Sequence, residues 1–365
     1  MFVLCWGLLP FLLYLGFVGA VWRCWRREKG SGQSDVLEEP LVSVVVPFRN
    51  EEKHLPALVA ALREQSHPDS LLEFLLVDDG SSDGGPAFLR RELADDARFV
   101  LLSSPARGKK QALRHAFDRC KGSLVLTTDA DCVPAPGWVA AVATAFTAQD
   151  ADFLFGLVRM RPGGGLFGAF ESADYMALQL SGAGAALLGM PVFCSAASMA
   201  FRRSAYFELR DRVGGQAWAS GDDVFLLHAF KSANKRIVFV KDAAAVVETP
   251  VGGSLPAYLR QRMRWGGKAR AYKDGASLGL AWVVFMTNLW LLALVAGALL
   301  GACSPWWPVL AFGIKAVVDG LLLRAGFRFL GADYSPGRHV LFSLFYPFLL
   351  LLSALGGLLS TPKWK

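Results

Sequence analysis

The sequence has few cysteines and few charges, and both scarcities exclude classes of protein. Its 365 residues include six cysteines. None of these forms a C-x-x-C pair, so we expect reduced thiols and neither a disulfide framework nor a zinc site. Only 19% of the residues are charged. No basic stripe interleaved with aromatic residues lies in the polar part of the chain, which argues against nucleic acid as a partner.

Nucleotide-cofactor loops are absent from the sequence as well. The apolar runs of the polar middle are followed by no G-x-G-x-x-G and no G-x-x-x-x-G-K-S/T sequence. A dinucleotide cofactor or a P-loop site is therefore not expected.

Hydrophobic residues are abundant instead, at 53% of the chain, with a mean hydropathy of +0.36. Three stretches contain no charged side chain: 1–22, 275–314 and 340–360. As one helix the second stretch would be about 60 Å long, twice the thickness of a bilayer core. A turn at 303–308 would divide it, which predicts four transmembrane helices in all. The three C-terminal ones are expected near 277–302, 306–323 and 340–360.

Basic residues indicate the orientation of these spans. Arginine and lysine cluster at 23–29, directly after the first apolar stretch, which favours an uncleaved anchor with the following domain in the cytosol. Arg324, Arg328 and Arg338 between the last two spans agree with that orientation. We therefore predict a multi-pass membrane protein with a cytosolic domain. Its parts are an anchor at 1–22, a basic and polar linker at 23–40, the cytosolic domain at 41–274 and transmembrane helices within 275–365.

Lys315 and Asp319 are ionisable residues inside the third predicted span, four positions apart on one helical face. Ionisable groups at that depth are costly and often functional, as a contact to a lipid head group would be. A plain ion pair within the helix is the other interpretation.

Residues 166–190 are rich in alanine, glycine and leucine, yet they include Glu171, Asp174 and Gln179. Those polar side chains argue against a span. An amphipathic segment on the membrane face of the domain, near an acceptor, and a buried core helix both fit the pattern.

The polar middle of the chain alternates strands with helices. Apolar runs at 41–47, 72–77, 99–102 and 124–127 fit strands buried on both faces, and 109–119 fits a helix. This alternation predicts an α/β domain with a mostly parallel, Rossmann-like sheet.

Polar clusters follow three of these strands, where ligands bind in parallel sheets. They are 47–50, Asp78-Asp79 and Asp129-Ala130-Asp131. Several carboxylates at one sheet edge need a cation, and Mg²⁺ or Mn²⁺ carrying substrate phosphates suits oxygen ligands. Taken alone, Asp78-Asp79-Gly80 would indicate only a turn and Asp129-Ala130-Asp131 only a loop, because aspartate and glycine are common there.

The order of the motifs is the more specific signal. Val-Pro-x-x-Asn-Glu at 46–51, Val-Asp-Asp-Gly-Ser at 77–81, Asp-x-Asp at 129–131, Gly-Asp-Asp at 221–223 and Gln-x-x-Arg-Trp at 261–265 occur in sequence. Over roughly residues 40–270 this set resembles the family 2 inverting glycosyltransferases, which have the GT-A fold. The flanking spans resemble the membrane-bound branch of that family, which includes ceramide glucosyltransferase and hyaluronan-synthase-like enzymes.

The resemblance implies roles for residues near the donor. It places Pro47, Arg49, Asn50, Glu51 and Asp79 at the nucleoside of a nucleotide sugar, which we expect to be UDP-linked. Gly-Lys-x-x-Ala-Leu at 108–113 would bring Lys109 to the diphosphate; an exposed helix start is the alternative. From the residues alone, Asn50 is also expected to cap a helix that starts at Glu51.

The resemblance further implies that Asp131 binds the metal and that Asp129 touches ribose or metal. Asp223 would be the general base that takes the proton from the acceptor hydroxyl, and Asp222 would support it. Acidic residues at 222–223 also suit a helix start, and both roles can hold together.

The Gln-x-x-Arg-Trp box completes the implied site. Gln261 and Arg264 would bind the donor, with Arg264 at the diphosphate, and Trp265 would line the acceptor end. The neighbouring basic residues Arg260, Arg262, Lys268 and Arg270 fit a membrane-proximal basic helix. Ser198 and Arg114 depart from the residues expected of relatives, which leaves the sugar and acceptor contacts open.

Several functions remain to be separated. The leading hypothesis is transfer of a sugar to a membrane-associated acceptor, a lipid or lipid-linked glycan. A polysaccharide synthase that elongates a chain is the first alternative, although four spans are few for a pore. A catalytically idle scaffold of the same fold is another, and a nucleotidyltransferase is a third that the Gln-x-x-Arg-Trp box argues against. Oligomeric state is left open.

Overall fold

The computed structural model describes residues 6–30, 39–161, 163–215, 218 and 221–359. The part of the predicted linker at 31–38 lies outside these residues. The chain divides into two compact units. One is the α/β unit, formed by 29–161 and 193–250, and the other is the helical unit, formed by 1–28, 162–192 and 251–363.

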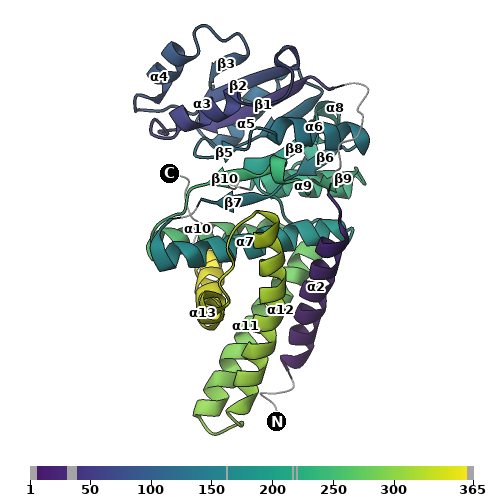
Figure 1. Ribbon diagram of the computed structural model, residues 1–365, viewed down its shortest axis with the longest axis vertical. Helices are drawn as coiled ribbons and strands as arrows, with labels where there is room; N and C mark the ends of the chain where they lie inside the picture. The colour runs from purple at the N-terminus through teal and green to yellow at the C-terminus, as the bar shows by residue number, and fades with distance from the viewer. Residues whose placement is uncertain (1–5, 31–38, 162, 216–217, 219–220, 360–365) are drawn as a thin grey trace. The chain divides into compact units, whose positions relative to one another are not determined.

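A seven-stranded sheet forms the α/β unit, in the order β3-β2-β1-β4-β8-β6-β9 (Figure 1). Strands β3, β2, β1 and β4 are parallel, whereas β8 is antiparallel to both of its neighbours. The mostly parallel α/β sheet is therefore confirmed. Its strands are β1 (Val42–Phe48), β2 (Leu72–Asp78), β3 (Phe99–Ser103), β4 (Leu124–Thr127), β6 (Phe153–Phe155), β8 (Met199–Arg202) and β9 (Ile237–Phe239).

The four strands expected from the sequence are found within one residue of their predicted bounds. All seven side chains of β1 are buried, which is why that segment reads as an unbroken apolar run. The sequence pattern missed the short strands β6, β8 and β9, which have three or four residues. It also missed a second sheet in the order β5-β10-β7, formed by Val133–Pro134, Val247–Thr249 and Val158–Met160.

Helices and short 3-10 turns connect the strands of the α/β unit. The predicted helix at 109–119 is α5 and ends two residues earlier, at Phe117. The helices are α3 (Leu55–Arg63), α4 (Gly85–Glu92), α5 (Lys109–Phe117), α6 (Trp138–Ala148), α8 (Arg203–Leu209) and α9 (Asp222–Ser232). The 3-10 turns are η1 (Asp69–Leu71), η2 (Ala196–Ser198), η3 (Arg210–Arg212) and η4 (Ala243–Ala245).

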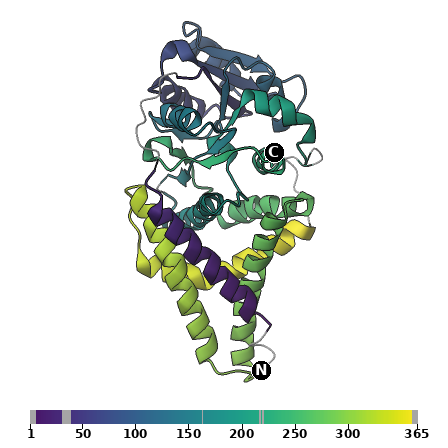
Figure 2. The same ribbon diagram turned by 90° about the vertical axis from the view of Figure 1, so that its right-hand side faces the viewer.

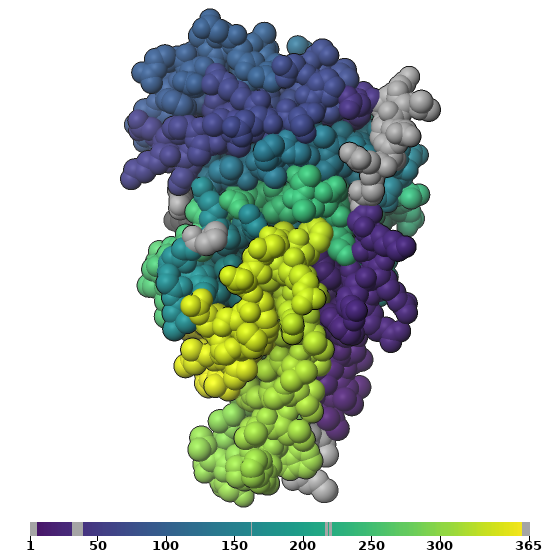
Figure 3. Space-filling model, viewed as in Figure 1, coloured from purple at the N-terminus to yellow at the C-terminus, as the bar shows by residue number. Residues whose placement is uncertain are grey.

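The helical unit contains the apolar stretches, and its long helices α2, α11 and α12 pack side by side (Figure 2). The helices are α2 (Leu8–Arg27), α7 (Gly165–Leu187), α10 (Leu255–Gly267), α11 (Gly275–Leu299), α12 (Trp306–Phe329) and α13 (Pro336–Leu359), with the 3-10 turn η5 (Lys268–Ala271). Figure 3 shows the side chains of α13 packed against those of α12, in agreement with the contacts between these helices.

Three described helices are long and apolar enough to cross a membrane: α2, α11 and α13. The predicted span at 306–323 is a helix of similar length, α12, but it is not among the three. It carries Lys315 and Asp319, and it continues to Phe329, so that Arg324 and Arg328 lie within the helix and not in a loop. The sequence expectation of three C-terminal spans is thus corrected to two that qualify by length and composition.

The compact units do not follow the single domain expected at 41–274. Residues 162–192 and 251–274 group with the long helices. Helix α7 packs against α2 and α12 within the helical unit. The close approach depends on small residues: a Cβ on Gly184 would lie 2.2 Å from Val21 Cγ1, and one on Gly326 would lie 2.5 Å from Leu180 Cδ1.

Lys315 and Asp319 form a buried ion pair of 2.6 Å within α12, as one of the two interpretations expected. The Tyr14 hydroxyl donates a hydrogen bond of 2.8 Å to Asp319. The Lys315 ammonium also lies 4.9 Å from the ring centre of Tyr14 and 5.1 Å from that of Tyr346. These contacts join α2, α12 and α13, which gives the pair a structural role in the bundle.

Helices α10 and α13 meet at glycines, which predicts a stability effect. A Cβ on Gly357 would lie 2.7 Å from Met263 O and 2.8 Å from Gly267 N, both backbone atoms that cannot rotate away. Gly357→Ala should therefore lower the free energy of unfolding by about 1–3 kcal/mol through overpacking. Thermal unfolding in detergent would measure this loss.

Gly279→Ala is the matched control, because a Cβ there meets nothing within 4 Å. Since alanine is the better helix former, this variant should be neutral or more stable by up to about 1 kcal/mol. Equal unfolding temperatures for the two variants would contradict the close-packing argument.

Candidate active site

The carboxyl ends of β1, β2 and β4 bring three polar clusters to one edge of the sheet. Phe48 pairs in register with Asp78, and Val45 pairs with Thr127 at the end of β4. The segments that follow these residues, 49–51, 79–83 and 128–131, therefore begin side by side. This is the edge at which open α/β sheets bind ligands.

Hydrogen bonds join the loops after β1 and β2. The Ser82 backbone N–H donates to Asn50 Oδ1 at 2.8 Å, and the Asn50 N–H donates to Ser81 Oγ at 3.1 Å. Asn50 has a left-handed backbone, with φ at 55°. The predicted helix cap at Asn50 is therefore wrong: helix α3 begins at Leu55, and the asparagine side chain instead holds the neighbouring loop.

Asp79 is buried, with only 3% of its surface exposed, and it holds the loop before α5. Its Oδ1 accepts a hydrogen bond of 2.6 Å from Gly108 N–H. Gly108 has φ at 120°, which favours glycine. Asp79 Oδ2 is buried and has no partner among the described residues. A buried carboxylate oxygen without a partner is costly, so a ligand donor at this position would be stabilising.

Lys109 connects the acids of two motifs. It forms an ion pair with Asp129, the first residue of the Asp-x-Asp segment. Burial alone would lower the pKa of Lys109, but attraction by Asp129, Asp222 and Asp223 outweighs it and raises the pKa. The lysine is thus charged, and it lies within electrostatic reach of both acidic pairs, so the structure brings the predicted residues of the α/β unit together.

The surroundings of Asp131 disfavour the negative charge of its carboxylate. Burial raises its pKa, and the charge of Asp129 raises it further. Its Oδ1 accepts only a weak 3.4 Å contact from Cys132 Sγ. Among the described residues no group of three or more His, Cys, Asp or Glu side chains could hold a metal. Two carboxylates with substrate phosphates are nonetheless the usual arrangement for Mg²⁺, so Asp129 and Asp131 fit such an ion.

Asp222 and Asp223 occupy the first turn of α9, after Gly221 with φ at 99°. Both residues therefore lie at the positive end of the helix dipole, which stabilises their charge. Asp223 Oδ2 accepts from Ala196 N–H at 3.3 Å, and its Oδ1 accepts from Val224 N–H at 2.8 Å. These bonds fix the carboxylate of Asp223 and leave lone pairs that can accept a proton.

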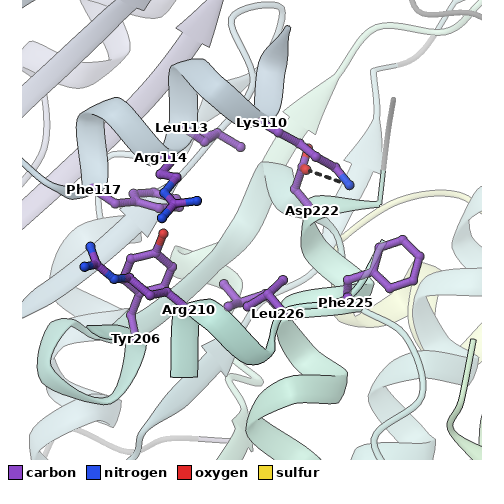
Figure 4. Close-up of a pocket in the computed structure, with 11 residues that line it drawn as sticks. Lys110, Leu113, Arg114, Phe117, Tyr206, Arg210, Asp222, Phe225 and Leu226 are labelled. Carbon is purple, nitrogen blue, oxygen red and sulfur yellow. Dashed lines mark ion pairs between the residues drawn. The ribbon is translucent and has the colours of Figure 1, made fainter. Parts of the chain in front are cut away.

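A cavity lined by α5, α8 and α9 opens beside Asp222 (Figure 4). Lys110 Nζ lies 3.8 Å from Asp222 Oδ1 there, and burial lowers the pKa of this lysine. Arg114, one of the two departures noted in the sequence, projects into the same cavity near Tyr206 and Arg210. Lys110 therefore lies within ion-pair distance of Asp222.

Ser198, the other departure, faces the core and not a ligand. It is 2% exposed, and Trp138 Nε1 donates to its Oγ at 3.2 Å. A Cβ on Gly156 would lie 2.8 Å from the same oxygen. The residue at 198 is thus set by internal packing.

The Gln-x-x-Arg-Trp box lies on α10, in the helical unit. Gln261, Arg264 and Trp265 are all half-buried there. Arg262, which was grouped with the basic residues of a membrane-proximal helix, forms an ion pair with Asp174 of α7 and is 11% exposed. Lys268 is buried, at 6% exposure, whereas Arg260 and Arg270 are exposed. The signal for Arg262 was present in its spacing from Tyr258 and Trp265, which places all three on one helical face.

Comparisons with known proteins agree on the class of this site. Residues 43–209 match the family model described as glycosyl transferase family 2. An N-acetylglucosaminyltransferase of Rhizobium meliloti (strain 1021) is 27% identical over 305 residues, which cover 76% of this chain and 70% of the relative. An undecaprenyl-phosphate 4-deoxy-4-formamido-L-arabinose transferase of Aeromonas hydrophila is 41% identical over 96 residues, covering 25% of this chain and 29% of the relative.

A solved structure shares the fold. The mannosyltransferase PcManGT from Pyrobaculum calidifontis, in complex with GDP-Man and Mn²⁺, matches with a TM-score of 0.56 and 22% identity. The match covers 89% of this chain and 98% of that protein. Together with the seven-stranded sheet and the family model, it identifies the α/β unit as a GT-A domain. Residues 43–209 therefore belong to glycosyl transferase family 2, whose members transfer a sugar from a nucleotide-sugar donor.

Proposed function

We propose that this enzyme transfers N-acetylglucosamine from a UDP-linked donor to a membrane-associated acceptor, a lipid or lipid-linked glycan, with inversion at the anomeric carbon. The observation that carries the proposal is the convergence of Asp129, Asp222 and Asp223 on Lys109, in a chain that also has three helices apolar enough to cross a membrane. The name of the rhizobial relative supports the choice of sugar.

The nucleoside would bind at the loops after β1 and β2. The resemblance to the family assigns Pro47, Arg49, Asn50, Glu51 and Asp79 to it. The unpartnered Oδ2 of Asp79 supports this assignment, because a donor N–H or hydroxyl of the nucleoside would satisfy it. The hydrogen bonds between the two loops hold the site in place before the donor arrives.

Asp129 and Asp131 would hold a divalent cation. When bound, Mg²⁺ or Mn²⁺ would neutralise the charge of the nucleoside diphosphate leaving group. The Mn²⁺ complex of the mannosyltransferase supports a metal at this fold. Lys109 would add a positive charge on the diphosphate side, consistent with its raised pKa.

Asp223 would act as the general base. Its carboxylate would take the proton from the acceptor hydroxyl while that oxygen forms a bond to the anomeric carbon and the bond to the diphosphate breaks. A single displacement inverts the configuration and needs one base and no enzyme nucleophile. Asp222, paired with Lys110, would keep the helix start in position.

The Gln-x-x-Arg-Trp box would contribute residues that bind the donor and a residue that contacts the acceptor. By resemblance, Gln261 and Arg264 belong to the donor diphosphate and Trp265 to the acceptor. The basic end of α2, with Arg26 and Arg27 in its last turn, supports a cytosolic orientation of the catalytic domain. The Aeromonas relative, named for undecaprenyl phosphate, favours a lipid acceptor over a growing polysaccharide.

A donor panel tests the proposal. Membranes that contain the enzyme would be incubated with UDP- and GDP-linked sugars, and the lipid extract would be analysed by mass spectrometry. We expect one added N-acetylhexosamine, from the UDP donor alone, on a lipid species. A ladder of polymer sizes would support the polysaccharide synthase instead, and transfer from GDP-mannose alone would contradict the donor assignment.

A further inference from the structure

A buried charged pair joins α7 to the Gln-x-x-Arg-Trp helix. Arg262 and Asp174 form an ion pair with side-chain exposures of 11% and 9%. The Tyr258 hydroxyl donates a hydrogen bond of 2.9 Å to Asp174. Removing two charges from water is costly, and an apolar pair of similar volume is often at least as stable. The pair is therefore poorly explained by stability alone.

The Arg262 guanidinium also lies against the tryptophan of the box. It is 4.6 Å from the Trp265 ring centre and 5.1 Å from that of Tyr258. No described group accepts a hydrogen bond from its buried Nε. The ion pair and the two rings thus hold the guanidinium, since arginine stacks well on aromatic faces.

Trp265 also has a contact with a residue of α7. The ring of Tyr175, the residue after Asp174, lies 6.0 Å from the Trp265 ring. The indole therefore contacts Arg262, from its own helix, and Tyr175 of α7. Its orientation depends on two neighbouring residues of α7, one through Arg262 and one directly.

We propose that Arg262 and Asp174 are positioning residues that set the orientation of Trp265, and through it the affinity for the acceptor. This inference rests on the proposed role of Trp265 at the acceptor. The motif Gln-x-x-Arg-Trp leaves the position of Arg262 unspecified, so Arg262 would be a fourth residue of the box with a role in the reaction. Asp174 would act from a separate helix and contribute only through Arg262 and Tyr258.

The test measures transfer from UDP-N-acetylglucosamine by the full-length enzyme in detergent, with a total lipid extract of the expressing membranes as acceptor. Asp174→Asn and Arg262→Gln should raise the apparent KM for the lipid extract between about 10- and 100-fold, as misplaced substrate contacts do. The KM for the donor should change less than about twofold, since these residues would not touch it. Arg260→Gln, at an exposed arginine of the same helix, is the control and should match the wild type.

Combined variants separate positioning from a purely structural role. In a Trp265→Ala background, Arg262→Gln should add little to the acceptor KM, because the residue it positions is gone. If Arg262→Gln does not fold, Tyr258→Phe replaces it, since it removes only the hydrogen bond to Asp174, and a smaller rise is expected. Fully additive effects, or equal changes in donor and acceptor KM, would overturn the inference. Absence of transfer by the wild type would instead contradict the proposed function.

Discussion

Asp223→Asn should reduce sugar transfer by about 10²- to 10⁴-fold, the contribution typical of a general base. Asparagine has nearly the shape of aspartate, and its amide oxygen can still accept one of the two bonds from Ala196 and Val224. The amide cannot take a proton from an acceptor hydroxyl. The variant should therefore fold and bind donor, and lose mainly the turnover number.

Two measurements make this prediction specific. UDP binding by calorimetry should be retained in Asp223→Asn within about threefold, because the base is not assigned to the nucleotide. Asp222→Asn is the matched control at the adjacent position, and it should cost less, since Asp222 supports the site through Lys110. If Asp222→Asn proved the more damaging change, the two roles would have to be exchanged.

The amount that the sequence could predict differs between the two units. Strand β1 and its neighbours were predictable because strands buried on both faces are unbroken apolar runs. The location of Asp79, Asp129 and Asp131 at one edge of the sheet could be predicted from those strands. Polar residues directly after parallel strands lie at the same edge. Which oxygen of Asp79 lacks a partner, and which acids surround Lys109, depends on loop geometry that no local pattern encodes.

The helical unit was harder to predict. Residues 166–190 left a surface segment and a core helix equally open. Most of this stretch is α7, which contacts α2 and α12, two helices distant in sequence. Arg262 was grouped with the other basic residues of a membrane-proximal helix, because the sequence shows only its charge and its place near the spans. Its burial depends on Asp174, 88 positions earlier in the chain by residue number, and on the ring of Trp265. A partner at that separation cannot be read from helical periodicity.

Metal removal should have the second large effect on activity. Treatment with EDTA should abolish transfer, and added Mn²⁺ or Mg²⁺ should restore it, if Asp129 and Asp131 hold a divalent cation. Burial and the neighbouring charge of Asp129 raise the pKa of Asp131. A cation would relieve that cost and offset the charge of the diphosphate.

Asp131→Asn should weaken the dependence of the transfer rate on metal, because it removes a proposed metal ligand. We expect at least about 100-fold lower transfer at a metal concentration that saturates the wild type, since even partners of metal ligands are worth 10- to 100-fold. Asp150→Asn is the control: this acid is 91% exposed and has φ at 44°, a conformation that asparagine tolerates. Titration of transfer rate against Mn²⁺ would measure both variants. A wild-type metal dependence in Asp131→Asn would remove this residue from the metal site and leave Asp129 as its candidate ligand.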